Sequence, residues 1–528
     1  MASRPHQIRV LFPLGGQNRR GGYAQKTEPY STPRALNVRG VGPLEKRGRG
    51  GVRPGLSKLV DNDFGDTIRA LSSLTYIDGD GDRQQHIVVV CDGSFYIVDG
   101  TSITESLATI EGDDVGAWTD DGDDPWIFDS TVASTAPFGE SMAFQLAQWN
   151  GKLFLADVTL KRYDPVGHQV DEIAGSPQNM PLICIFKERV ILAGADHMWY
   201  ASGQTDPYDW DFGKELGDVS RAVAGYVGHS GVIGEKILCL HNYQDDALIF
   251  GCRDSIWAIY GNPTENRKVN VSPHSGIIAP RALAVTPDGL VIFLTRRGLY
   301  TWTVGSTSDP APFSKYVVPE ELLAIDTSTT EVLMQYDHRN RGVHLFLTPT
   351  EGEGTHWWID LEYRALWPEK YPVDQQPIVS GVITTDGYSD VVFGCKDGYI
   401  RQFDDQAATD DGTQITSELL LGPFHVSRAE GVDGQVAEMV AAFAAGSGEV
   451  TWKLVMGKSA EEAVDAAEAA LDGDGLSGVD KIGDWQAGQN KVVYPRSRGP
   501  WAVLWLSSKE QWSYEAISMF NRRLGRLR

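Results

Sequence analysis

The most regular feature of the chain is a repeated pattern of hydrophobic and polar positions between residues 61 and 410. In each repeat a short apolar run is followed by a polar or glycine-containing turn and a second run that contains Trp, Tyr or Phe. Runs of this kind, bounded by turns, are typical of β-hairpins. The pattern occurs seven times, at 87–100, 152–167, 189–203, 247–261, 290–305, 343–361 and 391–405. The aromatic residues that follow the turns are Phe95, Tyr163, Trp199, Trp257, Tyr300, Trp357 and Tyr399.

These hairpins predict a β-propeller over residues 61–410. An isolated hairpin is marginally stable in water, so each hairpin must pack against others. The repeats are spaced roughly 40–60 residues apart, which is about the period of a four-stranded blade. A ring of blades also accommodates a chain of 528 residues, which is too long for one undivided core. We predict six or seven blades, with the first repeat as the place where strands from both ends could close the ring. A large β-sandwich and two unrelated β domains are the alternatives.

The pattern changes after residue 410. The segments 412–426, 435–446, 449–457, 490–508 and 512–528 are predicted to be strands. Between them lies one helix, for which Ser459 is a good N-cap and Glu462 a capping-box partner three positions later. Alanine fills the interior of this segment, and Gly473 is expected to end it. We therefore predict an all-β protein whose residues 411–528 form a small β-sandwich or platform domain with one helix.

Residues 1–60, here called the arm, differ in composition from the rest of the chain. The arm contains 12 Lys and Arg but two Asp and Glu. It therefore carries +10, and the remainder carries −34 of the net −24. Gly and Pro recur in the arm and disfavour regular structure. These features predict a basic, extended segment on an acidic body.

Four arginines of the arm, Arg39, Arg47, Arg49 and Arg53, are predicted to form an assembly interface. Guanidinium groups bind carboxylates and carbonyls through paired hydrogen bonds, and the neighbouring glycines permit a close approach of two backbones. We expect the arm to become ordered only against a neighbouring copy or another ring. A nucleic-acid-binding arm is the less favoured alternative, because the tract lacks interleaved aromatic residues for base stacking.

Charge, hydropathy and cysteine spacing narrow the classes of protein further. An acidic body argues against a protein that grips DNA, since phosphate binding requires dense Lys and Arg. The longest apolar runs, such as 87–90 and 291–294, have the length of strands, and no membrane span is predicted.

The N-terminal residues lack the apolar stretch of a signal peptide, so we expect synthesis in the cytoplasm without secretion. The five cysteines are far apart and are predicted to be buried free thiols.

The sequence contains no recognised constellation for catalysis, a cofactor or a metal ion, and we predict none. HExxH, Walker A and GxSxG motifs are absent. Asp78, Asp80 and Asp82 resemble the first ligands of a calcium loop, but Arg83 and Val89 occupy the positions of its glycine and glutamate. The acidic turns at 120–124 and 472–474 are likewise predicted to be solvated loops. A glycosidase needs a pair of carboxylates, and nothing marks any two of the 71 acidic residues for that role.

The arm contains a tract that resembles the N-terminal signature of many phage tail proteins, roughly LNV.P.....GR.RGG.RPGL. Here the tract is ALNVRGVGPLEKRGRGGVRPGL, at 35–56. The matching residues are Leu36, Asn37, Val38, Arg49, Gly50, Gly51, Arg53, Pro54, Gly55 and Leu56, and the departures are Gly40 and the segment 44–46. The segments 495–508 and 512–528 are also similar to the ending of this family. The chain thus resembles the tail nozzle, or tail tube, proteins of short-tailed (podovirus-type) bacteriophages.

The resemblance implies a virion structural protein that is not an enzyme. In that family six copies form a tube below the portal and adaptor rings, and tail fibres or spikes attach to the outside. The resemblance therefore implies a homohexamer located in the virion tail and assembled in the host cytoplasm. Double-stranded DNA would pass through the lumen without specific binding, and an acidic wall that repels phosphates agrees with that role. The alternatives are a receptor-binding or fibre-adaptor tail protein and, less favoured, a glycan-cleaving tail enzyme.

Overall fold

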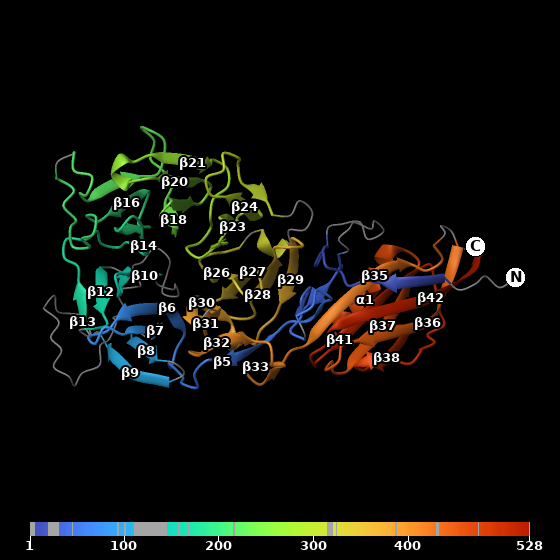
Figure 1. Ribbon diagram of the computed structural model, residues 1–528. Coiled ribbons are helices and arrows are strands. Elements are labelled where there is room, and N and C mark those ends of the chain that lie inside the picture. The colour runs from blue at the N-terminus through green and yellow to red at the C-terminus, as the bar shows by residue number, and fades with distance from the viewer. Residues whose placement is uncertain are drawn as a thin grey trace.

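The computed structural model describes residues 6–19, 31–44, 46–91, 94–99, 102–109, 145–156, 159–166, 169–214, 217–313, 320–323, 325–385, 388–428, 432–473 and 475–526. Two modules lie side by side: a ring of small sheets and an elongated sandwich next to the sixth and seventh sheets of that ring (Figure 1). The described residues include one α-helix, α1 (Ala460–Asp472), and the short 3-10 turns η2 (Pro263–Glu265), η3 (Glu320–Leu322) and η4 (Val373–Gln375). The prediction of an all-β protein with one helix is confirmed.

Seven four-stranded antiparallel sheets in the described part of the chain form a β-propeller. The first blade contains β6 (Ile68–Ile77), β7 (Arg83–Cys91), β8 (Ser94–Asp99) and β9 (Ser102–Thr109), and the second contains β10 (Gln145–Trp149), β11 (Lys152–Ala156), β12 (Leu160–Asp164) and β13 (Gln169–Glu172). The third contains β14 (Leu182–Ile185), β15 (Val190–Ala193), β16 (Met198–Ala201) and β17 (Val223–Tyr226), and the fourth contains β18 (Ile237–Tyr243), β19 (Ala247–Cys252), β20 (Ile256–Tyr260) and β21 (Lys268–Ser272). The fifth contains β22 (Leu283–Val285), β23 (Leu290–Thr295), β24 (Gly298–Thr303) and β25 (Ala311–Pro312), and the sixth contains β26 (Thr330–Asp337), β27 (Gly342–Pro349), β28 (Thr355–Asp360) and β29 (Ala365–Glu369). The seventh contains β30 (Pro377–Thr385), β31 (Tyr388–Cys395), β32 (Ile400–Asp404) and β5 (Gly55–Lys58).

Each predicted hairpin forms the second and third strands of one blade. The second strands are largely buried, and β19 is buried along its whole length because both of its faces pack against neighbouring blades. This burial explains their continuous apolar runs. Trp199 of the third blade's third strand fills space between two blades: it is fully buried and packs against Phe250 of the next blade, with 5.8 Å between ring centroids. The prediction of a propeller is confirmed, with seven blades.

The ring is closed by a strand from the arm. Strand β5 pairs antiparallel with β32, with Leu56 opposite Phe403, and completes the seventh blade. The prediction placed closure in the first repeat, and it is wrong on this point because residues 68–109 already supply four strands to the first blade. The seventh blade takes only three strands from its own segment, so its open edge accepts β5.

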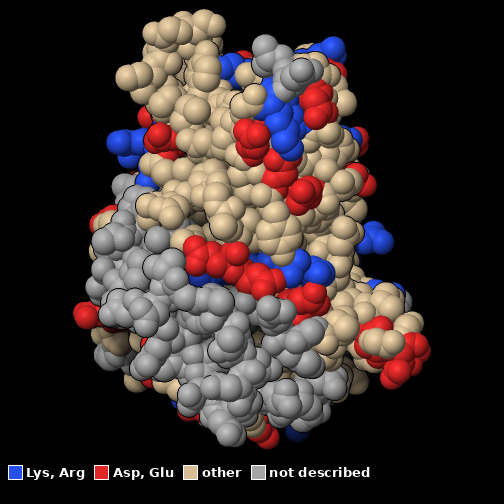
Figure 2. Space-filling view, turned by 90° about the vertical axis from the view of Figure 1, so that its left-hand side faces the viewer, with Lys and Arg blue, Asp and Glu red and all other residues tan. Residues whose placement is uncertain are grey.

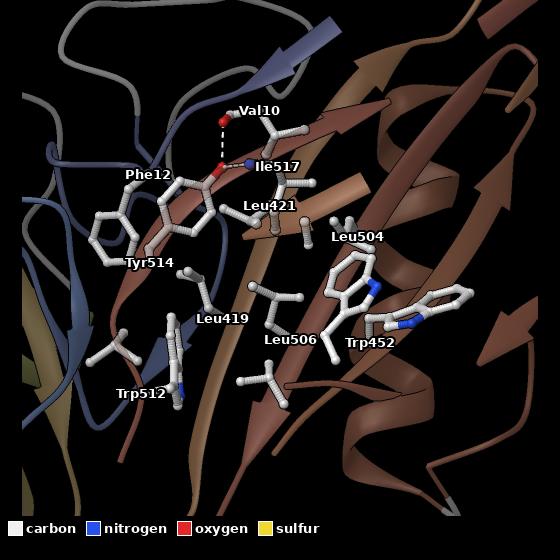
Figure 3. Packing of buried hydrophobic residues seen from close by; sticks show 14 of the residues in the cluster. Val10, Phe12, Leu419, Leu421, Trp452, Leu504, Leu506, Trp512, Tyr514 and Ile517 are labelled. Atoms are coloured by element: carbon white, nitrogen blue, oxygen red, sulfur yellow. Dashed lines mark hydrogen bonds between the residues drawn. The ribbon is translucent and has the colours of Figure 1, made fainter. Parts of the chain in front are cut away.

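The second module is a β-sandwich of two five-stranded sheets. One sheet contains β1 (His6–Val10), β42 (Tyr514–Arg526), β36 (Val432–Phe443), β39 (Gly488–Gln489) and β40 (Ser497–Arg498). The other contains β2 (Ala35–Leu36), β35 (Ser417–His425), β41 (Trp501–Ser508), β37 (Val450–Gly457) and β38 (Lys481–Trp485). Leu419 and Leu504 of the second sheet face Tyr514 and Ile517 of the first in a hydrophobic core (Figure 3). The predicted sandwich is confirmed.

Helix α1 covers the outer face of the second sheet. Ser459 is the N-cap, and its hydroxyl accepts from the backbone N–H of Glu462 at 3.0 Å. The carboxylate of Glu462 accepts from the backbone N–H of Lys458, one residue before the N-cap. The buried alanines of α1 pack on Val503 and Trp505, which explains the alanine-rich composition of this segment. No helix in the described ranges is long and apolar enough to cross a membrane.

The described residues of the arm contribute strands to both modules. Strands β1 and β2 belong to the sandwich and β5 to the propeller, while β3 (Val38–Arg39) pairs with β4 (Gly51–Val52) between them. A short ribbon, β33 (Thr409–Asp410) with β34 (Thr413–Gln414), follows the propeller. The structure differs here from the expectation that the arm becomes ordered only against a neighbouring copy or ring. Its pairing partners are distant strands of the same chain.

Candidate functional site

The four arginines predicted as an assembly interface lie in two environments. Arg39 and Arg53 are buried, with 2% and 0% of their surface exposed. Arg47 is exposed and Arg49 is half-buried. A buried guanidinium cannot contact another copy, so the prediction is wrong for Arg39 and Arg53 as surface residues. For Arg47 and Arg49 it stays a prediction.

Arg53 joins the arm to the propeller through a complete set of hydrogen bonds. Its Nη1 and Nη2 donate to the two carboxylate oxygens of Asp410 at 2.8 and 2.6 Å. The other donors reach the carbonyls of Pro54 and Lys370 and the side-chain oxygen of Asn37, at 2.8–3.0 Å. These five contacts use all five N–H groups of a guanidinium. The buried charge is therefore compensated by an ion pair and by hydrogen bonds in every direction.

Arg39 forms a second buried ion pair, with Glu369 at the end of β29. Its Nε and Nη2 donate to the two carboxylate oxygens at 2.5 and 3.0 Å. The guanidinium carbon lies 4.4 Å from the centroid of the Trp358 ring, so the cation also packs on an aromatic face. The hydroxyl of Tyr371 donates to Glu369 at 2.5 Å, and the ring of Tyr371 lies under Arg53 at 4.2 Å. Tyr371 thus links the two ion pairs.

Asn37 connects three parts of the chain. Its side-chain oxygen accepts from Arg53 and from the backbone N–H of Lys370, and its side-chain nitrogen donates to the carbonyl of Thr416. Its φ of 54° lies in the left-handed region, which asparagine adopts more readily than most residues. Arm, propeller and sandwich therefore meet at one buried side chain. Asn37, Arg39, Arg53, Glu369, Tyr371 and Asp410 are together called the arm junction below.

Two glycines of the signature tract allow the arm to lie against other backbone and ring atoms. Gly50 has a φ of +80°, and a Cβ atom there would overlap the ring of Phe12. A Cβ atom at Gly55 would overlap the carbonyl oxygen of Thr409. Close backbone approach was predicted for these glycines, and the structure places it inside the chain instead of against a second copy.

Further basic residues of the arm pair with acidic residues of the body. These pairs are Arg34–Asp472 at 2.8 Å, Lys46–Asp405 at 2.5 Å and Lys58–Asp411 at 3.6 Å. The charge difference between arm and body therefore serves, at least in part, to fasten the arm to its own chain. These exposed or half-buried pairs each contribute about 0–1 kcal/mol, whereas removal of one partner of a buried pair costs about 3–5 kcal/mol.

The protonation states of the arm junction follow from its burial and its charges. Burial alone would raise the pKa of Glu369, but the neighbouring Arg39 lowers this pKa to about 2. Burial raises the pKa of Tyr371 well above its usual value, and the Glu369 carboxylate adds to that shift. At neutral pH Glu369 is therefore charged and Tyr371 is a neutral donor, as their hydrogen bond requires.

A buried histidine beside the arm junction makes stability depend on pH. His356 packs between the rings of Phe346 and Tyr371 at 5.5 and 5.2 Å, and burial lowers its pKa to about 3 from 6.5. Below pH 6.5 the unfolded chain binds a proton at this residue that the folded chain excludes, so stability falls as the pH falls. From this residue alone we expect a loss of about 2 kcal/mol between pH 7.5 and pH 5. Burial lowers the pKa of His241 and His344 too, and both add in the same direction.

The measurement is urea unfolding of the wild type and of His356→Leu at both pH values. The variant should lose about 2 kcal/mol less than the wild type between them. His338→Leu, at an exposed histidine near the sixth blade's first turn, is the matched control and should behave like the wild type. An equal loss in His356→Leu and the wild type would contradict the expectation.

The other predicted features lie apart from the arm junction. Asp78 begins a turn in which its carboxylate accepts from the N–H groups of Asp80 and Asp82 and from Gln84. No group of three or more His, Cys, Asp or Glu side chains in the described ranges is placed to hold a metal ion. The five cysteines are free thiols; four are buried and Cys184 is half-buried. The acidic turn at 120–124 and residue 474 lie outside the described residues.

Sequence reasoning found the arginines but not their carboxylate partners. Glu369 and Asp410 lie 330 and 357 residues from Arg39 and Arg53. Nothing in the local sequence distinguishes either one from the other acidic residues. The charge difference between arm and body was the one available signal, and it predicted an acidic partner without showing that the partner is the same chain.

Comparisons with known proteins add little to this geometry. No family model and no curated protein matches the chain. Among solved structures, that of U3-55K is similar with a TM-score of 0.40 and 9% sequence identity, over 66% of this chain and 100% of that one.

Proposed function

We propose that the chain is a structural subunit of the tail nozzle of a short-tailed bacteriophage, without catalytic activity. Copies of it would form a tube below the portal and adaptor rings, with fibres or spikes outside and DNA passing within. The observation that carries the proposal is the role of the signature tract: residues that match the nozzle proteins also form the arm junction.

There is a physical reason why residues of the signature tract also form the arm junction. The arm passes between a propeller and a sandwich. This path requires the residue types found at Asn37, Arg53 and Gly55. A family that shares those residues at the same spacing is therefore expected to share this architecture. The junction also joins the two modules through two buried ion pairs, which suits a tube subunit that must keep its shape while DNA is ejected.

The charge of the molecule supports the same role. Described arm cations are largely matched by acidic residues of the same chain, while the chain as a whole carries −24. On the end of the propeller that faces away from the sandwich, Lys and Arg side chains stand next to Asp and Glu side chains (Figure 2). In the second blade, for example, Lys152 pairs with Asp164 at 2.6 Å. A chain with this net negative charge favours passage of DNA without specific binding.

The test is to purify the chain, alone and mixed with a portal–adaptor complex, and to examine it by mass photometry and cryo-electron microscopy. We expect a ring of six copies around an axial channel, attached to the adaptor. A monomer that does not bind the complex and is absent from virion tails would contradict the proposal. Binding of that monomer to host cells would favour a receptor-binding or fibre-adaptor protein, and release of sugars from host glycan would favour a tail enzyme.

Arg47 and Arg49 are the predicted interface arginines that remain near the surface. We expect Arg47→Ala/Arg49→Ala to leave the unfolding free energy within about 0.5 kcal/mol of the wild type, because neither residue is fully buried. The same variant should reduce the fraction of chains in rings at low salt, and its difference from the wild type should shrink at high salt, because salt screens the same charge interactions in the wild type. Mass photometry at low and high salt measures both effects.

The matched control is Arg296→Ala/Arg297→Ala, which removes two exposed arginines from a turn of the fifth blade. This control should assemble like the wild type. If the Arg47/Arg49 variant also assembled normally at every salt concentration, these two residues would not be part of the interface.

A further inference from the structure

A cavity of about 510 Å³ lies at the centre of the propeller. All seven blades contribute to its wall through or beside their innermost strands. The lining runs from Leu71 and 145–148 through 183–185, 240–242 and 280–283 to 333–335 and Ser380. The volume falls within the range of about 300–1,000 Å³ that is common for small-molecule sites.

The wall combines apolar surface with a small set of polar side chains. The polar residues are Gln145, Gln148, His241, Asn242, Arg281, Gln335 and Ser380, and no Asp or Glu is among the lining residues. The accessible surface of the lining is more polar than apolar, which suits a ligand that is rich in hydroxyl groups.

Several of these polar groups are held in place by neighbouring blades. The side-chain oxygen of Gln145 accepts from the backbone N–H of Ile183 in the next blade at 3.1 Å, which leaves its amide nitrogen as a donor. The nitrogen of Gln148 donates to the carbonyl of Thr75 at 2.6 Å, which leaves its oxygen as an acceptor. Ser380 donates to Gln335 at 2.9 Å. Neutral donors and acceptors fixed in this way match the hydroxyl groups of a ligand, because a hydroxyl both donates and accepts.

Arg281 supplies the positive charge of the lining. Its carbonyl accepts from the backbone N–H of Met334 at 2.8 Å, which fixes the residue between the fifth and sixth blades. Burial lowers the pKa of its guanidinium to about 10, and Glu331, which does not line the cavity, opposes that shift. A desolvated guanidinium gains from an anion that can form charge-assisted hydrogen bonds with it.

We propose that the centre of the propeller binds a small hydroxylated organic anion, of monosaccharide size, with its carboxylate or phosphate at Arg281. The amides of Gln145 and Gln148, the hydroxyl of Ser380 and the imidazole of His241 would then contact the hydroxyl groups of the ligand. Burial lowers the pKa of His241 to about 4, so its ring is neutral and adds no second charge. The inference rests on the cavity alone and does not depend on the proposed place of the chain in a tail.

The test is isothermal titration calorimetry of the full chain with glucuronate, glucose 6-phosphate, glucose and inorganic phosphate as probes. We expect saturable binding of one or both sugar anions and at least about tenfold weaker binding of neutral glucose, since a charge-assisted contact contributes roughly 1.5–3 kcal/mol. Glucuronate and glucose 6-phosphate separate a sugar acid from a sugar phosphate. Equal binding of inorganic phosphate would show that the hydroxyl-matching groups play no part, and would overturn the proposal.

Arg281→Gln should weaken binding of the sugar anion at least about tenfold. Arg267→Gln, at an exposed arginine of the fourth blade, is the matched control and should leave binding unchanged. If Arg281→Gln does not fold, as judged by circular dichroism, His241→Leu provides a second variant on another blade. Absence of binding by every probe at millimolar concentration, or unaltered binding in a folded cavity variant, would overturn the proposal. Ring formation is measured separately, so failure of either proposal leaves the other intact.

Discussion

Replacing Arg53 by alanine is expected to lower the free energy of unfolding by about 3–5 kcal/mol, because the change leaves Asp410 buried and charged without its partner. The carbonyls of Pro54 and Lys370 and the side chain of Asn37 also lose their donors. A typical domain is stable by only about 5–15 kcal/mol, so this loss is a large part of the total. Urea unfolding followed by tryptophan fluorescence measures it, and Trp512 and Trp367 near the arm provide sensitive probes.

The matched control is Arg47→Ala, which removes an exposed arginine from the same tract and should change stability by less than about 0.5 kcal/mol. A double-mutant cycle isolates the buried pair. In Arg53→Ala/Asp410→Asn the uncompensated charge is gone, so the double variant should be more stable than the sum of the two single changes predicts. A loss of less than about 1 kcal/mol in Arg53→Ala would show that the buried pair does not fasten the arm.

Removing residues 1–60 is expected to abolish cooperative folding of the remaining chain. The truncation deletes β5 from the seventh blade, and β1 and β2 from the sandwich. It also removes the ion-pair partners of Glu369 and Asp410 and the segment that covers these two carboxylates. Together these losses are expected to exceed the stability of an ordinary domain. The measurement is thermal unfolding by circular dichroism, in which residues 61–528 should show no cooperative transition.

Complementation in trans provides the control for this truncation. A separate 1–60 segment, produced together with 61–528, should restore a cooperative transition, because the arm pairs through backbone hydrogen bonds that do not require a continuous chain. The same segment carrying Arg53→Ala should restore it poorly. A truncated chain that unfolds cooperatively near the wild-type temperature would show that the arm is an appendage, as its composition suggested.

Local patterns in the sequence were sufficient for much of the fold. The seven hairpins were correctly placed because both strands of each lie within about twenty residues and a turn joins them. The helix at Ala460–Asp472 was found because its cap, alanine interior and terminating glycine are adjacent in sequence. The sandwich was predicted because the segments after residue 410 have the length of strands but do not follow the propeller repeat. These features need no information about distant parts of the chain.

The tertiary structure decided where distant segments meet. Val10 lies opposite Ile517, and Leu56 opposite Phe403, in strand pairs that no local pattern links. Arg39 and Arg53 were predicted to lie in an assembly interface, whereas the path of the arm between two modules buries them against carboxylates of their own chain. The central cavity exists because seven inner strands surround one axis, although its residues are scattered over more than three hundred positions. The sequence alone therefore determined the local elements and the basic side chains of the arm. Long-range strand pairing and burial decided which carboxylates those side chains bind.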